Sequence, residues 1–176
     1  MYAEIYADRK RDLIPYEPDQ FYVYDFTLAE LKTLKRRQKF LNRSQELNDK
    51  FDILTLQEVI DNVRRLTIDH PRNTNSDTPV GLYIELKNYQ QNMDFIGLNM
   101  ADLLNEVLRS NGLGTKADCL ATKMPIIIQS FELPALYKYE LLSDLPLVFL
   151  VWYTYETPDW EEVSKLAHGV GVGPQA

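Results

Sequence analysis

From residue 80 onward, the hydrophobic positions of the chain follow two alternating patterns. Short continuous apolar runs, typical of strands buried on both faces, are separated by stretches whose apolar residues recur every three or four positions, as on one face of a helix. The predicted strands are residues 80–86, 125–130, 147–153 and a run that starts at residue 169. The predicted helices are residues 99–110, 133–142 and 157–167. This alternation predicts a parallel sheet covered on both faces, either doubly wound or closed as a (β/α)₈ barrel.

Local polar residues mark where two of these helices begin and end. Asn99 is expected to cap the helix over residues 99–110, and Gly112 to terminate it. Pro134 falls in the first turn of the helix over residues 133–142, where a missing amide costs nothing. The side chains expected to face inward from the first of these helices are Leu103, Leu104, Val107 and Leu108.

The pattern before residue 80 is less regular. Residues 1–26 hold no lasting period, which predicts a loop or arm with a short strand at residues 21–24. Residues 27–66 are predicted to be helical, and residues 67–79 to form a surface loop. Two capping boxes, each a threonine followed three positions later by a glutamate, predict helix starts at residues 27–30 and 55–58. The basic residues interpreted as the solvated end of the first helix are Lys35, Arg36, Arg37 and Lys39.

Composition narrows the classes of protein. With 176 residues and 20.5 kDa, the chain has the length of one domain or of a piece of a larger one. Apolar residues at 45% and charged residues at 26% exclude a disordered chain. No apolar run reaches the roughly 18 residues of a membrane-spanning helix, and no signal peptide is expected. A net charge of −7 argues against a nucleic-acid-binding protein, which needs a basic face. The single cysteine, Cys119, excludes an internal disulfide framework and a cysteine-based zinc site.

Candidate chemistry lies where the predicted strands end. Glu85 and Lys87 are two residues apart near the carboxyl end of the strand over residues 80–86, so they point to the same side of the sheet. Gln129 ends the next strand in the same way. Active sites of parallel barrels are built at that end, and a carboxylate beside a lysine suits a divalent cation next to a phosphate. The alternative is a structural ion pair between Glu85 and Lys87, which their spacing makes equally acceptable.

Other polar candidates favour structural roles. Ser130 is expected to cap the following helix, because neither histidine is placed to act as its base. His70 falls in the polar loop and is expected to be solvated, whereas His168 precedes a glycine-rich strand start and is interpreted as structural. Cys119 lies among polar residues without the basic surroundings that activate a thiol.

Two motifs carry a resemblance to a known family. Ile84-Glu-Leu-Lys87, followed by Ile127-Ile-Gln-Ser-Phe131, is similar to the glycerophosphodiester phosphodiesterase family, in particular its longer, periplasmic-type members. The segments that add to this resemblance, in the right order over nearly the whole chain, are residues 6–11, 26–31, 51–58 and 171–174.

The resemblance implies a fold, a reaction and a set of site residues. Members of that family fold as a (β/α)₈ barrel, bind Ca²⁺ or Mg²⁺, and hydrolyse glycerophosphodiesters to sn-glycerol 3-phosphate and an alcohol. By resemblance, Glu85 is a carboxylate ligand of the metal. Lys87 would face the phosphate, Gln129 would line the site, and Phe131 would lie near its mouth, all as substrate-binding residues.

Further motifs of the family have no counterpart in the chain. Its His-Arg-Gly, its Glu-x-Asp and its second catalytic histidine would precede Met1, and its last strands would follow Ala176. We therefore expect residues 1–176 to be a single partial domain of the α/β class, a barrel incomplete at both ends and without a catalytic residue of its own. Such a chain is expected to be inactive alone and to self-associate through its open sheet edges.

Three hypotheses stay open at this point. The chain is a portion of an active phosphodiesterase, a non-catalytic remnant that acts as a binding or regulatory module, or an unrelated α/β interaction module. Resemblance to periplasmic-type members is compatible with a secreted or extracytoplasmic parent protein, whereas the sequence itself leaves the location open. In the first hypothesis the partner is a glycerophosphodiester substrate, and in none is it a nucleic acid.

Overall fold

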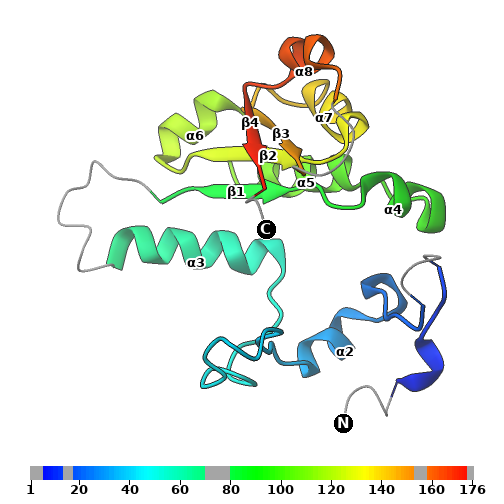
Figure 1. The fold of residues 1–176 in the computed structure, drawn as a ribbon. Coiled ribbons are helices and arrows are strands. Elements are labelled where there is room, and N and C mark those ends of the chain that lie inside the picture. The colour runs from blue at the N-terminus through cyan, green and yellow to red at the C-terminus, as the bar shows by residue number, and fades with distance from the viewer. Residues whose placement is uncertain (1–5, 14–17, 70–79, 153–157, 174–176) are drawn as a thin grey trace. The chain divides into compact units, whose positions relative to one another are not determined.

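The computed structural model describes residues 6–13, 18–69, 80–152 and 158–173 (Figure 1). The chain consists of two compact units, Met1–Glu58 and Val59–Ala176, which we call the N-terminal unit and the sheet unit. The expectation of a single partial domain over residues 1–176 stays a prediction.

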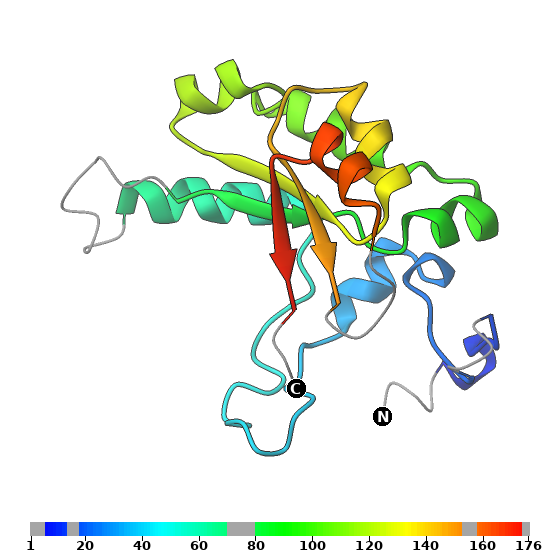
Figure 2. The same cartoon turned by 45° about the horizontal axis from the view of Figure 1, so that its top comes forward.

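A parallel sheet forms the centre of the sheet unit. Its strands are β1 (Leu82–Glu85), β2 (Ile126–Ser130), β3 (Leu147–Val151) and β4 (Gly169–Val172). Each strand falls within its predicted apolar run, and all neighbours pair in parallel in the order β1-β2-β3-β4 (Figure 2). A doubly wound sheet reverses its strand order at a switch point, whereas consecutive order is the arrangement of strands in a barrel. The α/β fold is therefore compatible with a partial barrel.

Helices alternate with these strands. Those of the sheet unit are α4 (Tyr89–Ile96), α5 (Met100–Ser110), α6 (Lys116–Thr122), α7 (Leu133–Glu140) and α8 (Trp160–Leu166). Helix α3 (Leu56–Asp69) begins in the last residues of the N-terminal unit, and its other residues belong to the sheet unit. The predicted helices correspond to α5, α7 and α8, whereas α4 and α6 were not predicted. No helix in the described part of the chain is long and apolar enough to cross a membrane.

The two faces of the sheet differ in burial. Ile126, Ile128 and Ser130 on β2 are each at most 2% exposed, and α7 packs against β2 and β3. The residues between them, Ile127 and Gln129, are only half-buried. Because successive side chains of a strand point to opposite faces, helices bury one face of these strands and leave the other more open. The sequence predicted helices on both faces of the sheet. Within the described residues, helices bury one face of β2 and β3, and the other face is more exposed.

Helix α5 begins and ends as predicted, and the expected burial of Leu104 and Leu108 is confirmed, whereas that of Leu103 is not. The Asn99 side chain accepts hydrogen bonds from the Ala101 and Asp102 amides, and Gly112 adopts a left-handed φ of 63° after the helix. The buried residues are Ala101, Leu104 and Leu108. The expected inward orientation of Leu103 is wrong, since this side chain is 42% exposed. Positions three and four apart share a helix face, and Leu103 lies one position off that stripe.

Short helices and loops make up the N-terminal unit. Its elements are η1 (Ala7–Arg9), η2 (Val23–Asp25) and α2 (Leu28–Thr33). The predicted strand at residues 21–24 is wrong, because residues 21 and 22 form no strand and η2 begins at Val23. The predicted basic helix end is also wrong, because α2 stops at Thr33. Leu34 is extended, and two of the basic residues beyond it form ion pairs with a distant acidic segment, Lys35 with Asp52 and Arg37 with Asp49.

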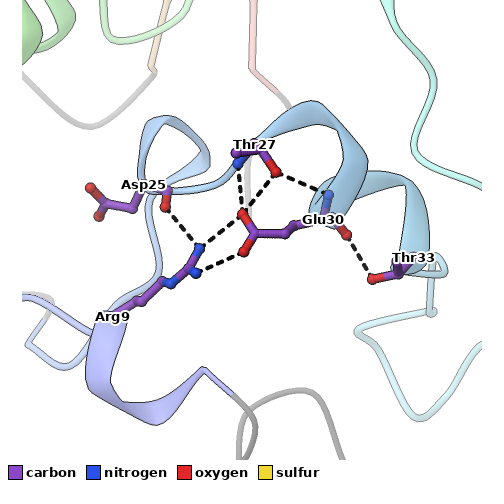
Figure 3. A network of polar contacts seen from close by, with 5 residues as sticks. All are labelled: Arg9, Asp25, Thr27, Glu30 and Thr33. Atoms are coloured by element: carbon purple, nitrogen blue, oxygen red, sulfur yellow. Dashed lines mark hydrogen bonds and ion pairs between the residues drawn. The ribbon is translucent and has the colours of Figure 1, made fainter.

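Both predicted capping boxes are present. At the start of α2, the Thr27 amide donates to Glu30 Oε2 at 2.8 Å, and the Glu30 amide donates to Thr27 Oγ1 at 3.3 Å (Figure 3). Arg9 donates to both Glu30 carboxylate oxygens, at 3.0 and 2.7 Å. These contacts lower the pKa of Glu30 to about 2, with the Arg9 hydrogen bonds as the main cause. Local capping and a long-range ion pair therefore meet on one carboxylate.

The second capping box repeats this arrangement. The Thr55 amide donates to Glu58 Oε2 at 2.7 Å, and the Glu58 amide donates to Thr55 Oγ1 at 3.2 Å. Lys32 forms an ion pair with the same carboxylate, and this hydrogen bond is the main cause that lowers the pKa of Glu58 to about 2. The N-terminal unit thus carries two carboxylates that stay ionised far into acid.

Candidate functional site

A hollow of about 300 Å³ opens at the carboxyl ends of three neighbouring strands, β1, β2 and β3. Its lining residues are Glu85, Leu86, Lys87, Asn88, Phe131, Glu132 and Trp152. The lining comes from residues at or just after the last residue of each strand, because parallel strands bring all their carboxyl ends to one edge. This is the edge at which the sequence predicted a site.

Three of the predicted site residues line this hollow. Glu85 is the last residue of β1 and half-buried, Lys87 follows it and is exposed, and Phe131 follows β2. Gln129 is the register partner of Glu85 on β2 but is not among the lining residues. The structure thus brings Glu85, Lys87 and Phe131 together and keeps Gln129 on the adjacent strand. The roles of these residues in binding metal or substrate stay predictions.

No ion pair joins Glu85 to Lys87, both of which belong to the described residues. The structural ion pair considered as the alternative role for this couple is therefore not formed. An ionisable side chain at a strand end that is not paired with its charged neighbour is available for a ligand.

An aromatic pair forms part of the wall. The rings of Phe131 and Trp152 stack with centroids 5.1 Å apart and planes inclined by only 4°. Trp152 is 57% exposed, so much of its indole is accessible from the solvent. Sequence reasoning missed Trp152, although it follows β3 just as Phe131 follows β2. The sequence placed Trp152 inside the predicted strand over residues 147–153, and only the end of β3 at Val151 shows that Trp152 follows the strand.

Glu132 is a second carboxylate in the lining, and sequence reasoning missed it too. Its Oε1 accepts a hydrogen bond from the Tyr89 amide at 2.7 Å, and its Oε2 accepts one from the Gln90 amide at 2.9 Å. Each oxygen accepts one backbone N–H, so two hydrogen bonds fix the position of this carboxylate and use part of its acceptor capacity. The donors lie more than forty residues away in the sequence, so no local motif could have revealed the contact.

The described residues do not complete a metal site. Among them, no group of three or more His, Cys, Asp and Glu side chains lies close enough together to hold a metal ion. Ca²⁺ takes about six to eight oxygen ligands and Mg²⁺ about six. Glu85 could supply one carboxylate, whereas each oxygen of Glu132 already accepts a backbone hydrogen bond and keeps only its remaining lone pair. The prediction that Glu85 binds Ca²⁺ or Mg²⁺ thus requires ligands beyond those described here.

Other polar candidates have structural partners. The buried Ser130 hydroxyl donates to the Leu86 carbonyl at 2.7 Å and accepts from the Glu132 amide at 3.1 Å. His168 Nδ1 accepts from the Leu147 amide at 3.2 Å, which fixes the start of β3. Cys119 is buried, and burial raises the pKa of its thiol. His70 lies outside the described residues.

Comparison with known proteins tests the family resemblance. No family model matches the chain. The sequence is 36% identical over 155 residues to the glycerophosphodiester phosphodiesterase GDPD6 of Arabidopsis thaliana, a match that covers 83% of this chain. The match covers 38% of the length of that relative. The family resemblance predicted from the motifs is thereby confirmed, and the short coverage is consistent with a match to only a portion of such a protein.

Proposed function

Because this chain belongs to the glycerophosphodiester phosphodiesterase family, we propose that it forms one sector of a (β/α)₈ barrel that hydrolyses glycerophosphodiesters to sn-glycerol 3-phosphate and an alcohol. The observation that carries this proposal is the hollow at the carboxyl ends of β1 to β3, lined by Glu85, Lys87 and Phe131. A site at this edge is where parallel barrels carry their chemistry. The chain spans 38% of its relative's length, so a sector is what the match supports.

Strand order and burial support the barrel. The strands follow one another without a switch point, and helices bury one face of β2 and β3. The other face carries Tyr83, 52% exposed, and the half-buried Gln129. In a closed barrel this second face would point into the interior, where side chains from all strands fill the space.

Each lining residue has a role that its chemistry suits. The exposed ammonium of Lys87 would pair with the phosphodiester anion, and the Phe131 ring would contact the carbon skeleton of the substrate. Glu85 would donate one carboxylate to the divalent cation, Ca²⁺ or Mg²⁺, on which the family's chemistry depends. Gln129 would hydrogen-bond a polar part of the substrate from the next strand. This chain's contribution is therefore to bind and orient the substrate, and we assign it no general acid or base.

A binding or regulatory module without hydrolysis is the second candidate. It is favoured by the structural engagement of Ser130, His168 and Cys119, which the sequence analysis had considered as nucleophile, base or reactive thiol. Such a module would keep the affinity for a phosphate or phosphodiester and would turn over no substrate.

A binding experiment on the full 176-residue chain tests the site. Inorganic phosphate and sn-glycerol 3-phosphate would be titrated against the chain and its Lys87→Met variant, with Lys165→Met on α8 as the matched control. Loss of a charged hydrogen bond should weaken binding roughly tenfold or more in Lys87→Met. Lys165 is 69% exposed and does not line the hollow, so its variant should bind as tightly as the wild type. Equal affinity of all three proteins would exclude Lys87 from the site.

A chimera separates enzyme from binding module. This chain would replace the matching segment of the Arabidopsis relative, and hydrolysis of glycerophosphocholine would be measured with Ca²⁺ or Mg²⁺ present. Loss of a metal ligand should reduce activity at least as much as loss of a group that hydrogen-bonds that ligand. Turnover by the chimera should therefore fall about 100-fold or more in its Glu85→Gln variant, and this result supports the enzyme. The exposed Glu106→Gln on α5 is the charge-matched control. A folded chimera that binds phosphate through Lys87 without turnover favours the binding module.

A further inference from the structure

Helix α4 begins shortly after Lys87 and is capped in an unusual way; we call residues 86–90, which include Lys87 and the start of α4, the Lys87 segment. Its N-cap residue, Asn88, is left-handed with φ 53° and makes no side-chain cap hydrogen bond. Other helices of the chain use their own N-cap side chain, those of Thr27, Asn99, Thr115 and Asp159. The first amides of α4 instead bind a side chain from another loop, the Glu132 carboxylate.

The Glu132 contact fastens two loops together. Glu132 lies immediately after Phe131 and is itself the N-cap residue of α7. Its two oxygens accept from Tyr89 and Gln90, at 2.7 and 2.9 Å. A carboxylate at a helix start satisfies amides that lack intrahelical partners and lies favourably in the field of the helix dipole. The loop after β2 is therefore bonded to the helix after β1, and the bonds are of the strong charge-assisted kind.

The segment that carries Lys87 is also held on its other side. The Leu86 amide donates to the Gln129 carbonyl at 2.9 Å, and the Leu86 carbonyl accepts from Ser130 Oγ at 2.7 Å. Asn92 Nδ2 donates to the Lys87 carbonyl at 3.3 Å. Residues 86–90 are thus fixed on both sides of Lys87: Ser130 bonds Leu86 before it, and Glu132 bonds Tyr89 and Gln90 after it.

We propose that Glu132 is a positioning residue of the hollow, whose carboxylate holds the Lys87 segment against the Phe131 loop. It acts through the backbone of α4, whose first two amides its oxygens bind. That the hollow binds a phosphate or phosphodiester rests on the function proposed above. The hydrogen bonds of Glu132 between the two loops do not depend on that function. Without the carboxylate, two amides of α4 lose their acceptor and the backbone on either side of Lys87 gains freedom. An anion would then have to pay for ordering Lys87 on binding.

The full chain and three variants test this inference. Glu132→Ala removes both acceptors, and Glu132→Gln keeps one amide oxygen, so it should restore part of the effect. Asp159→Ala is the matched control, because the Asp159 carboxylate also accepts from two helix amides, those of Glu161 at 2.9 Å and Glu162 at 3.2 Å. Asp159 does not line the hollow. Amide hydrogen exchange would be measured by NMR, and affinity for inorganic phosphate from shifts of the Lys87 amide.

Glu132→Ala should speed exchange at Tyr89 and Gln90 about tenfold or more and weaken phosphate binding roughly tenfold, in line with the loss of charge-assisted hydrogen bonds. Asp159→Ala should speed exchange at Glu161 and Glu162 and leave phosphate affinity within about twofold of the wild type. Glu132→Gln should fall between the wild type and Glu132→Ala in both measurements.

The outcomes distinguish this inference from the proposed function. Unchanged exchange at residues 87–90 in Glu132→Ala, or an equal loss of affinity in Asp159→Ala, overturns the positioning role. If exchange rises in Glu132→Ala while wild-type phosphate binding is insensitive to Lys87→Met, the loops are fastened as proposed and the assigned function fails. Should Glu132→Ala not fold, Glu132→Gln carries the same comparison with a smaller expected change.

Discussion

The N-terminal unit and the sheet unit are stabilised by different interactions. In the sheet unit, side chains such as Ile128, Leu136 and Tyr139 are 0% exposed. In the N-terminal unit, none of the described hydrophobic side chains is fully buried, and Leu41 is 90% exposed. Most of the described ion pairs nevertheless lie in the N-terminal unit. Fully buried apolar side chains therefore distinguish the sheet unit, whereas ion pairs are concentrated in the N-terminal unit.

This difference predicts which perturbation each unit will respond to. Hydrophobic burial scales with the apolar area removed from water and is insensitive to moderate salt and pH. Exposed charge pairs weaken in salt, and a carboxylate stabilised by a cation loses its partner interaction when it is protonated. A core truncation should therefore damage the sheet unit, and acid or salt should first damage the N-terminal unit.

The largest effect is expected from Ile128→Ala in β2. Ile128 is 0% exposed, and loss of its side chain leaves a cavity as well as removing buried area. The free energy of unfolding of the sheet unit should fall by about 2–5 kcal/mol. Both tryptophans, Trp152 and Trp160, belong to the sheet unit, so urea unfolding followed by tryptophan fluorescence measures this unit.

Leu120→Ala is the control for this truncation. It removes a side chain of similar size that is 79% exposed on α6 of the same unit, and should change the free energy of unfolding of the sheet unit by no more than about 0.5 kcal/mol. A comparable loss in the two variants would show that burial of a side chain does not decide how much it stabilises this unit.

A smaller effect is expected from Asn99→Ala at the start of α5. The Asn99 side chain accepts from the Ala101 amide at 3.0 Å and the Asp102 amide at 3.2 Å, and alanine leaves both without this acceptor. Loss of an N-cap typically costs about 1 kcal/mol, which the same fluorescence measurement would detect. Asn99→Asp keeps an acceptor and should remain within a few tenths of a kcal/mol of the wild type. Equal losses in both variants would contradict the capping role.

Fold elements were predictable where the signals are local. The capping boxes at Thr27 and Thr55 and the Asn99 cap depend on residues within one turn, and the strands depend on continuous apolar runs. Helix α4 was missed because its sequence is rich in polar residues and its cap, Glu132, comes from a distant loop. Helix α2 was predicted too long, because Lys35 and Arg37 pair with acidic residues far along the chain. Partners distant in sequence are what patterning cannot supply.

The same distinction applies to the candidate site. Glu85 and Lys87 could be selected because topology brings the ends of parallel strands together, and strand ends can be read from apolar runs, whereas Phe131 was selected by the family resemblance. The contact between Glu132 and α4 required the three-dimensional arrangement of two loops. Gln129 was placed on the correct strand, but only the three-dimensional structure separates residues that line the hollow from their register neighbours.

Acid should loosen the N-terminal unit before the sheet unit. The pKa of Glu30 is lowered from 4.5 to about 2, chiefly by Arg9, and that of Glu58 is lowered to about 2, chiefly by Lys32. A depressed pKa means that the ionised form is favoured in the folded state. The stabilisation is therefore fully present above about pH 4.5 and is lost as the pH falls toward 2. NMR shifts of the Glu30 amide should move over this interval, whereas sheet-unit amides such as that of Ile128 should move less.

Glu30→Gln provides the control for the acid transition. It removes the titrating group that Arg9 stabilises, so the movement of shifts around residue 30 between pH 4.5 and 2 should largely disappear. Persistence of the same movement in Glu30→Gln would assign it to another group and contradict the role of the Arg9–Glu30 pair.

Salt is expected to have the smallest effect and to discriminate best between the units. At about 1 M ionic strength the screening length falls to about 3 Å, so partly exposed pairs such as Arg9–Glu30, with side chains 33% and 26% exposed, lose much of their attraction. Amide exchange at Glu30 should accelerate about twofold to fivefold, in line with the small contribution of single exposed pairs. Exchange at Ile128 should stay constant or slow slightly, because sodium chloride does not weaken apolar burial. Equal acceleration at both amides would mean that charge pairs are no more important in the N-terminal unit than in the sheet unit.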